Sequence, residues 1–393
     1  MISSFYQMQR PTSWAKAPEI FSFSTLKLIE SCPLRWQLEN SDWPEFGRYP
    51  CRPFAAAIEG QIIHAGLEGL FRCMGLAGLP EMDSPEFYQE AASFNLGNLI
   101  EVKMQEHLDE IARHPRGHSF RFERKKQHLI NETINTFRNV YKPEARLPKR
   151  SPHSRSTQKS AQNPVDYAFL LSQHKYLSEI YIAAEPLQLA GIIDTVFIEQ
   201  DRLVIADFKT GAQQPEHLDQ LQLYALLWHS ATGQVADELR LVYPGATVSH
   251  ACSPEQLKKV RKALQTRITA AGTELAANPA AGRLSDNCRH CSVRQLCVAY
   301  WQSPHIVRKK SELKKKAAIG SIDIAATLLQ PPGETGSLVS LPDGTQLPIV
   351  WESTTGSALN QLQKDASVRI LNSIYDIDNK SLFLKPNSET FLA

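Results

Sequence analysis

Two short apolar runs in the middle of the chain place two carboxylates and a lysine within reach of one another. The runs flank the polar segment 199–202, a pattern typical of two antiparallel strands joined by a tight turn. If Gln200 and Asp201 are the central residues of that turn, the register puts Asp194 directly opposite Asp207. This hairpin restricts the chain to folds that are built around a sheet.

The charges of this hairpin need compensation. Side chains alternate along a strand, so Asp207 and Lys209 share one face. Opposed like charges destabilise a sheet, whereas Mg²⁺ takes one or two carboxylates and keeps several waters. Lys209 would then orient an attacking water or stabilise charge on a phosphate. The pattern predicts a metal-dependent phosphodiesterase; the alternative is that Asp194 and Asp207 are solvated and Lys209 forms a surface ion pair.

Length and composition set the outer limits. With 393 residues the chain is long enough for two or three domains, and a net charge of +2 means that affinity for nucleic acid must come from local patches. The first residues lack the basic start and apolar core of a secretion signal, and no long uncharged apolar run appears. We therefore expect a cytoplasmic protein without membrane contact. A phosphate-binding loop with a Gly-x4-Gly-Lys-Ser/Thr pattern is also absent, which excludes a recognisable helicase motor.

The seven cysteines are unevenly distributed. Three of them, Cys288, Cys291 and Cys297, form a C-x2-C-x5-C pattern, and Cys32 lies far upstream. A distant cysteine could supply the fourth ligand by joining the two ends of the region. Four thiolates suit either zinc or an iron–sulfur cluster, and the residues alone leave both open. The remaining cysteines are expected to be ordinary core thiols: Cys51, Cys73 and Cys252.

Three further motifs complete a recognisable set: Ser22-Phe-Ser-Thr-Leu26 ahead of Cys32-Pro33, Gly60-x3-His64, and Gln220-x3-Tyr224. With the hairpin and the cysteines, they resemble RecB-type exonucleases of the PD-(D/E)XK superfamily over residues 21–300. The chain looks most like the iron–sulfur subgroup, which includes AddB nuclease domains and the RecB-like nucleases of CRISPR adaptation.

The resemblance assigns roles to individual residues. It implies that a [4Fe–4S] cluster is held by Cys32, Cys288, Cys291 and Cys297. It also implies that Mg²⁺ or Mn²⁺ is bound by His64, Asp194 and Asp207, that Lys209 assists the water, and that Gln220 and Tyr224 position the strand. An additional acid is expected at Glu179, with Glu185 as its rival.

Each of these assignments has a simpler alternative. A histidine on an apolar helix face, such as His64, is usually a packed core residue. Gln220 and Tyr224 lie four residues apart on one helix face, where solvent could satisfy both. Glu179 could be a surface carboxylate of its strand. The residues alone do not choose between the two interpretations.

The expected fold is α/β, and the resemblance implies a PD-(D/E)XK (restriction-endonuclease-like) core with helical additions. We predict helices over 55–74 and 215–229, strands over 236–243 and 246–252, and a helix capped by Ser253 that ends near 276. Short alternating runs with turn signals after residue 320 predict a small β-barrel, OB-like or SH3-like. The expected units are a nuclease domain (1–305) with a basic loop at 142–162, a basic linker (306–319) and a small β-rich domain (320–393).

The sequence therefore predicts a metal-dependent DNA nuclease, an exonuclease acting on single-stranded ends or flaps in DNA repair, recombination or antiviral defence. Its partners would be DNA and a separate helicase or CRISPR and other defence proteins. The alternative is a non-catalytic DNA-end-binding or scaffold subunit of such a complex. The retained cluster of Asp194, Asp207 and Lys209 argues for the enzyme, because a binding module has no need of it.

Overall fold

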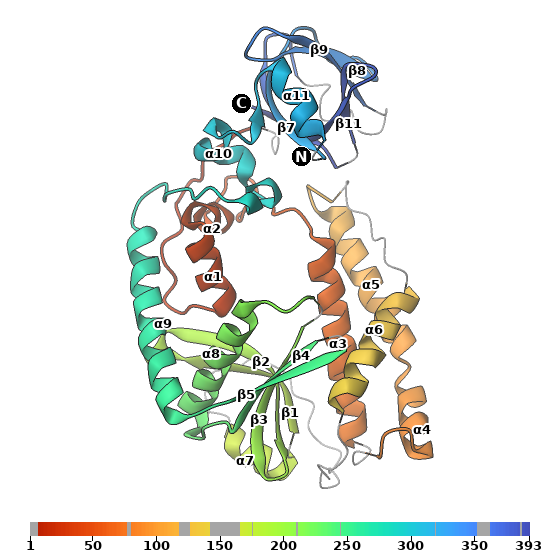
Figure 1. The fold of residues 1–393 in the computed structure, drawn as a ribbon, viewed down its shortest axis with the longest axis vertical. Coiled ribbons are helices and arrows are strands. Elements are labelled where there is room, and N and C mark those ends of the chain that lie inside the picture. Colours follow the sequence, from red (N-terminus) through yellow and green to blue (C-terminus); the bar gives the residue numbers. More distant parts are fainter. Residues whose placement is uncertain are drawn as a thin grey trace.

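The computed structural model describes residues 7–76, 80–117, 126–141, 166–174, 176–209, 211–243, 245–318, 320–351, 362–385 and 387–393. The basic loop expected at 142–162 lies outside these residues. Figure 1 shows a layered α/β body with a small barrel at one end. No helix among the described residues is long and apolar enough to cross a membrane.

A five-stranded mixed sheet forms the centre of the body. Its strands are β1 (Tyr176–Ala184), β2 (Leu189–Glu199), β3 (Arg202–Phe208), β4 (Glu238–Tyr243) and β5 (Ala246–Ala251), and they lie in that order. Only the β3–β4 pair is parallel, and the helix α8 (Pro215–Thr232) provides the crossover that a parallel pair requires. After β1, the order of hairpin, helix, two strands and helix is the predicted one.

The hairpin between β2 and β3 has the predicted register. Thr195 pairs with Ala206, and the ladder continues to the turn at Gln200 and Asp201. Both turn residues have positive φ angles, 49° and 60°, which a two-residue turn matching the strand twist requires. Asp194 lies one residue beyond the last pair, so the ladder ends where the charged residues begin.

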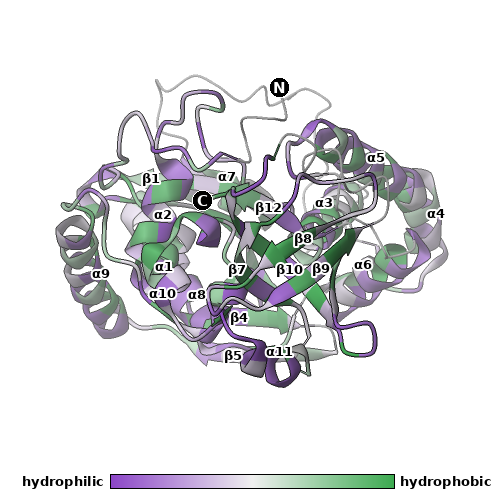
Figure 2. Cartoon of the chain, turned by 90° about the horizontal axis from the view of Figure 1, so that it is seen from above, coloured by the Kyte–Doolittle hydropathy of each residue, from purple (hydrophilic) through white to green (hydrophobic). Residues whose placement is uncertain are grey.

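Helices cover both faces of the sheet. On one face α8 packs with α1 (Phe23–Ser31) and α9 (Pro254–Glu274), whose first turns are capped by serine side chains. On the other face α3 (Ala55–Leu76) packs with α4 (Pro85–Phe94), α5 (Leu96–Arg113) and α6 (Lys126–Val140). The shorter helices are α2 (Pro33–Asn40), α7 (Tyr167–His174) and α10 (Val298–Gln302). Seen from the barrel end, α9 and the α4–α5 pair lie on opposite flanks (Figure 2).

The predicted C-terminal barrel is present. Its strands are β7 (Ile322–Leu328), β8 (Gly336–Ser340), β9 (Gln346–Trp351), β10 (Ser367–Asp376) and β11 (Ser381–Leu384). The order β7-β8-β9-β11-β10 closes on itself through the pairing of β10 with β7. The last strand, β12 (Glu389–Leu392), is added to β10. Alternate side chains of β9 are buried, as expected for strands that enclose a core.

Residues 306–318, which make up all but the last residue of the predicted basic linker (306–319), are folded onto the barrel. They contain β6 (Ile306–Val307), which pairs with β7, and the helix α11 (Lys310–Ala317). Val307 and Leu313 are fully buried in the barrel core. Lysines dominate the composition of α11. The apolar side chains of Val307 in β6 and Leu313 in α11 nevertheless anchor this segment to the barrel.

Candidate metal centre and cysteine pocket

The predicted carboxylates meet at the end of the β2–β3 ladder. Asp194 and Asp207 are both buried, and the backbone N–H of Phe208 donates to Asp194 Oδ2 at 2.8 Å. Lys209 Nζ lies 2.6 Å from Asp207 Oδ2. The interpretation as solvated surface charge is therefore wrong for these two aspartates, because their carboxylates lie inside the protein.

His64 and Glu179 lie beside Asp194. Ligand atoms of these three residues lie within 4.8 Å of one another, and His64 Nδ1 is 3.8 Å from Asp194 Oδ2. The set combines one imidazole nitrogen with carboxylate oxygens, which suits Mg²⁺, Mn²⁺ and related divalent cations. The donor chemistry and spacing thus fit a divalent metal centre, with Asp207 at its edge.

Glu179 owes its place to a kink that the sequence did not reveal. The pairs Ser178–Thr195 and Ile180–Ile193 bracket Glu179 and Asp194, which the ladder skips, and Glu179 has a φ of 50°. A positive φ at a non-glycine residue inside a strand is uncommon and strained, and such strained residues cluster at functional sites. The kink directs the carboxyl group of Glu179 toward Asp194 and His64.

Burial controls the protonation of the centre. It raises the pKa of Asp194 and of Asp207 to about 7, with mutual repulsion as a further cause for Asp207. Burial and the nearby carboxylates of Glu68 and Asp207 likewise raise the pKa of Glu179 to about 7. Burial lowers the pKa of His64, which favours the neutral imidazole that binds metals. A cation would remove the repulsion and favour the ionised carboxylates.

A hydrogen-bonded row leads away from Asp207. Lys209 Nζ donates to Gln220 Oε1 at 2.8 Å, and Gln220 Nε2 donates to the Tyr224 hydroxyl at 2.6 Å. Gln220 and Tyr224 therefore find hydrogen-bond partners within the protein, on the side of Lys209. Their distance of four residues on α8 brings both onto the face that meets the strand ends.

Gly191 allows α8 to approach this closely. A Cβ atom at Gly191 would lie 3.0 Å from Tyr224 Cε1 and 3.2 Å from Leu227 Cδ1. Packing therefore explains the glycine three residues before Asp194: it leaves space for Tyr224, whose hydroxyl accepts the hydrogen bond from Gln220.

An open groove leads to the centre along α3. Its lining consists of small and polar residues of that helix together with Glu179, Gln220 and Tyr224; the helix residues are Ala56, Ala57, Gly60, Gln61, His64, Ala65 and Glu68. Sequence reasoning missed Glu68, although its position one helical turn after His64 places it on the same helix face. The rival acid, Glu185, lies outside this group, exposed in the short turn after β1.

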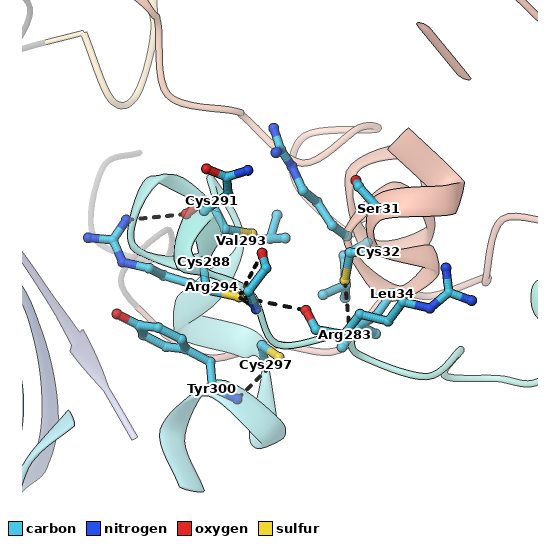
Figure 3. Close-up of a pocket in the computed structure, with 14 residues that line it drawn as sticks. Ser31, Cys32, Leu34, Arg283, Cys288, Cys291, Val293, Arg294, Cys297 and Tyr300 are labelled. Carbon is cyan, nitrogen blue, oxygen red and sulfur yellow. Dashed lines mark hydrogen bonds between the residues drawn. The ribbon is translucent and has the colours of Figure 1, made fainter. Parts of the chain in front are cut away.

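The four cysteines of the predicted cluster line one pocket. Cys32 lies at the junction of α1 and α2, and Figure 3 shows it facing the loop that carries the other three, Cys288, Cys291 and Cys297. All are free thiols, and the side chains of Arg35, Arg283 and Arg294 line the same pocket. The residues with other predicted roles, Cys51, Cys73 and Cys252, do not line it.

Three of the sulfur atoms accept backbone N–H groups, from Arg283 to Cys32 (3.5 Å), from Ser285 to Cys288 (3.3 Å) and from Tyr300 to Cys297 (3.4 Å). Burial raises the pKa of Cys291 to about 12, so its thiolate requires a strong positive partner. The four cysteines thus share one pocket with N–H donors and arginines, but among the described residues no three of their sulfurs lie within 4.8 Å of one another, as the ligand atoms of His64, Glu179 and Asp194 do.

Most of the chain is similar to one known family of proteins. Residues 20–298 match a family described as the PD-(D/E)XK nuclease superfamily. No curated protein sequence matches the chain significantly. Among solved structures, one described as "Crystal structure of SSO0001" is 16% identical, covers 34% of this chain and 66% of its own length, and has a TM-score of 0.22. The match thus spans just under two thirds of that structure.

A second solved structure, described as "Structural mimicry for functional antagonism", is 6% identical. It covers 50% of this chain and 79% of its own length, with a TM-score of 0.17. Both scores are low, and neither likeness bears on the residues of the site.

Proposed function

The chain belongs to the PD-(D/E)XK nuclease superfamily, and from that premise we propose that it is a metal-dependent deoxyribonuclease whose centre is built by His64, Glu179, Asp194 and Asp207. Members of this superfamily hydrolyse phosphodiester bonds with Mg²⁺ or Mn²⁺. The observation that carries the proposal is the convergence of buried carboxylates, an imidazole and a lysine at the end of one hairpin.

The roles of the residues follow from their positions. A bound divalent cation would lower the pKa of a water molecule and offset the charge on the phosphate. Lys209 orients the attacking water or stabilises the charge that develops on the phosphate. Gln220 and Tyr224 fix the Lys209 ammonium through their hydrogen bonds and keep it next to Asp207.

The cysteine pocket is proposed to hold a [4Fe–4S] cluster that joins the N-terminal helices to the segment after α9. The four sulfurs, their N–H donors and the surrounding arginines support this role. Zinc is the competing occupant. Anaerobically purified protein should show a broad absorption band at about 400 nm that bleaches on reduction, whereas a colourless protein with bound zinc would favour zinc.

The substrate is proposed to be single-stranded DNA or a duplex with single-stranded ends, degraded exonucleolytically. A separate helicase, or CRISPR or other defence proteins, would supply the strand. The closed barrel, which we take as a small OB-like domain within 320–393, is suited to guide it. The competing function is a non-catalytic DNA-end-binding or scaffold subunit.

The test is degradation of end-labelled single-stranded DNA in Mn²⁺. We expect Lys209→Ala to reduce the rate at least 100-fold, since electrostatic stabilisers of this kind contribute about that much. Binding measured in Ca²⁺ should persist. A matched control is Lys103→Ala, which removes an exposed ion pair with Glu106 on α5 and should leave the rate unchanged.

Several outcomes would contradict the proposal. Wild-type rates in Lys209→Ala would show that the activity arises elsewhere. Binding without cleavage by the wild type, in Mg²⁺ and in Mn²⁺, would favour the scaffold subunit. Circular single-stranded DNA separates the modes of attack, because an exonuclease leaves it intact.

A further inference from the structure

Two large apolar side chains lie exposed beside the metal centre. Tyr181 on β1 is 56% exposed and Ile192 on β2 is 48% exposed, although the two are directly paired across the strands. Cross-strand pairs of this kind usually stabilise a sheet by packing under a covering layer. Here β1 is the edge strand, and the pair remains accessible to solvent.

The register places this pair next to the metal-binding acids. Glu179 and Asp194 lie opposite each other at the break in the β1–β2 ladder, and Tyr181 and Ile192 are each two residues further along, where the pairing is regular. Residues two apart on a strand share a face, at a distance of about 7 Å. The neighbouring residues Ile180 and Ile193 are buried in the core on the other side. The exposed apolar pair and the acid pair therefore form one continuous surface.

The pair is held in place from behind. The Tyr167 hydroxyl donates to the backbone carbonyl of Tyr181 at 2.7 Å, which fixes the edge strand at this residue. The Tyr181 hydroxyl has no hydrogen-bond partner within the described ranges of the chain. Its ring is more than half exposed, so one apolar face is accessible two residues from Glu179.

We propose that Tyr181, backed by Ile192, is a positioning residue that stacks on the nucleobase adjacent to the scissile phosphate. This inference rests on the proposed nuclease function, because it takes the phosphate to lie at the acids. Glu179 and Tyr181 are two residues apart on β1, a separation of about 7 Å. This separation is comparable to the distance between a backbone phosphate and the base of the same nucleotide. Exposed aromatic rings bind unpaired bases through their π-faces without regard to sequence.

The stacking surface also defines the class of substrate. A base that is paired within a duplex cannot place its face on Tyr181, so the site would accept a nucleotide only after it has been unpaired. The preference for single strands would thus arise at the centre itself, with little dependence on which base is present.

The test is a double-mutant cycle in which Tyr181→Ala is combined with an oligonucleotide that lacks one base. Binding of single-stranded oligonucleotides is measured in Ca²⁺ by fluorescence anisotropy, and kcat and KM are measured in Mn²⁺, with the abasic position moved along the strand. We expect Tyr181→Ala to weaken binding about tenfold and to act mainly on KM. One abasic position should weaken wild-type binding by a similar factor and should not weaken the variant further.

Two comparison variants separate stacking from general damage. Tyr181→Phe keeps the ring and should bind like the wild type. Tyr88→Ala removes a comparably exposed tyrosine, 52% exposed on α4, and should have no effect. A thermal unfolding curve for each variant reports whether the fold is intact.

The inference is overturned if Tyr181→Ala and Tyr88→Ala bind alike, or if an abasic position weakens wild type and Tyr181→Ala by equal factors. Cleavage by the wild type in that case leaves the nuclease proposal standing. If no cleavage occurs, the nuclease proposal fails, while the binding cycle still decides whether Tyr181 stacks on a base.

Discussion

Asp194 and Asp207 make the metal-free protein sensitive to pH. Burial raises the pKa of both to about 7, above the usual value of 3.8. The folded state therefore binds protons more tightly than the unfolded state between these values. The free energy of unfolding is largest at the acidic end of this window and falls as the pH rises through it. A bound cation would reverse this loss at neutral pH.

Asp194→Asn tests this coupling. The amide oxygen can still accept from the Phe208 N–H, but the buried charge is gone. At pH 8 without metal we expect the variant to be more stable than the wild type by about 1 kcal/mol or more, with the difference vanishing near pH 4. Chemical denaturation at both pH values measures it.

Adding Mn²⁺ at pH 8 should stabilise the wild type and not the variant. Asp109→Asn, at an exposed position on α5, is the control and should behave like the wild type at every pH. A metal-free Asp194→Asn protein that is less stable than the wild type at pH 8 would contradict the assigned cost of burial.

At the level of elements, the hairpin β2–β3 was predictable and the kink in β1 was not. The register followed from a two-residue turn and from alternating side chains, both of which are local. The positive φ of Glu179 is imposed by distant contacts, because Ile180 must enter the core while the carboxyl group meets His64 on α3. A glutamate in a strand-like run carries no local signal of this strain.

Other elements also divide into those that local sequence predicts and those that depend on distant contacts. The capped start of α9 at Ser253 was predictable, since the capping serine and first-turn proline act within one turn. The packing of residues 306–318 was obscured by their lysines, because only Val307 and Leu313 of this segment enter the barrel core. The prediction that Cys32 lies with the other three cysteines required the family resemblance, because sequence spacing alone does not show that distant segments meet.

The contact between β2 and α8 yields a prediction at Gly191. Gly191→Ala places a methyl group 3.0 Å from Tyr224 Cε1, so the ring must shift and Gln220 and Lys209 with it. We expect a loss of about 1 kcal/mol in stability from overpacking. The rate should fall about tenfold, because a small misplacement of a catalytic group is costly.

Gly272→Ala provides the matched control, since no atom lies within 4 Å of its added methyl group and alanine favours the interior of a helix such as α9. This control should be as stable as the wild type or more so, with an unchanged rate. A Gly191→Ala protein with full activity would refute the idea that Tyr224 positions Lys209 through Gln220.

On the scale of the whole molecule, buried ion pairs fasten the barrel to the cysteine loop. Arg116, after α5, forms a bidentate pair with Glu389 on β12, with both contacts at 2.8 Å and both side chains buried. Arg294, within the cysteine loop, contacts Asp323 on β7 at 2.6 Å. Because isolated buried charges are costly, these pairs make the docked position of the barrel specific.

Arg116 also donates to the backbone carbonyl of Ser292, which follows Cys291. Glu389→Gln removes the charge that balances this guanidinium, and we expect a loss of about 3 kcal/mol in stability. The loop next to Cys291 should loosen as well. Thermal unfolding, limited proteolysis between body and barrel, and metal content after purification measure these effects.

The double variant Arg116→Met/Glu389→Leu isolates the cause. It removes both charges and keeps apolar volume, so it should recover much of the stability that Glu389→Gln loses. Glu106→Gln, in the exposed pair with Lys103, should cost almost nothing. If Glu389→Gln keeps wild-type stability and metal content, the barrel is held by its apolar contacts, and the cysteine pocket does not depend on the ion pair.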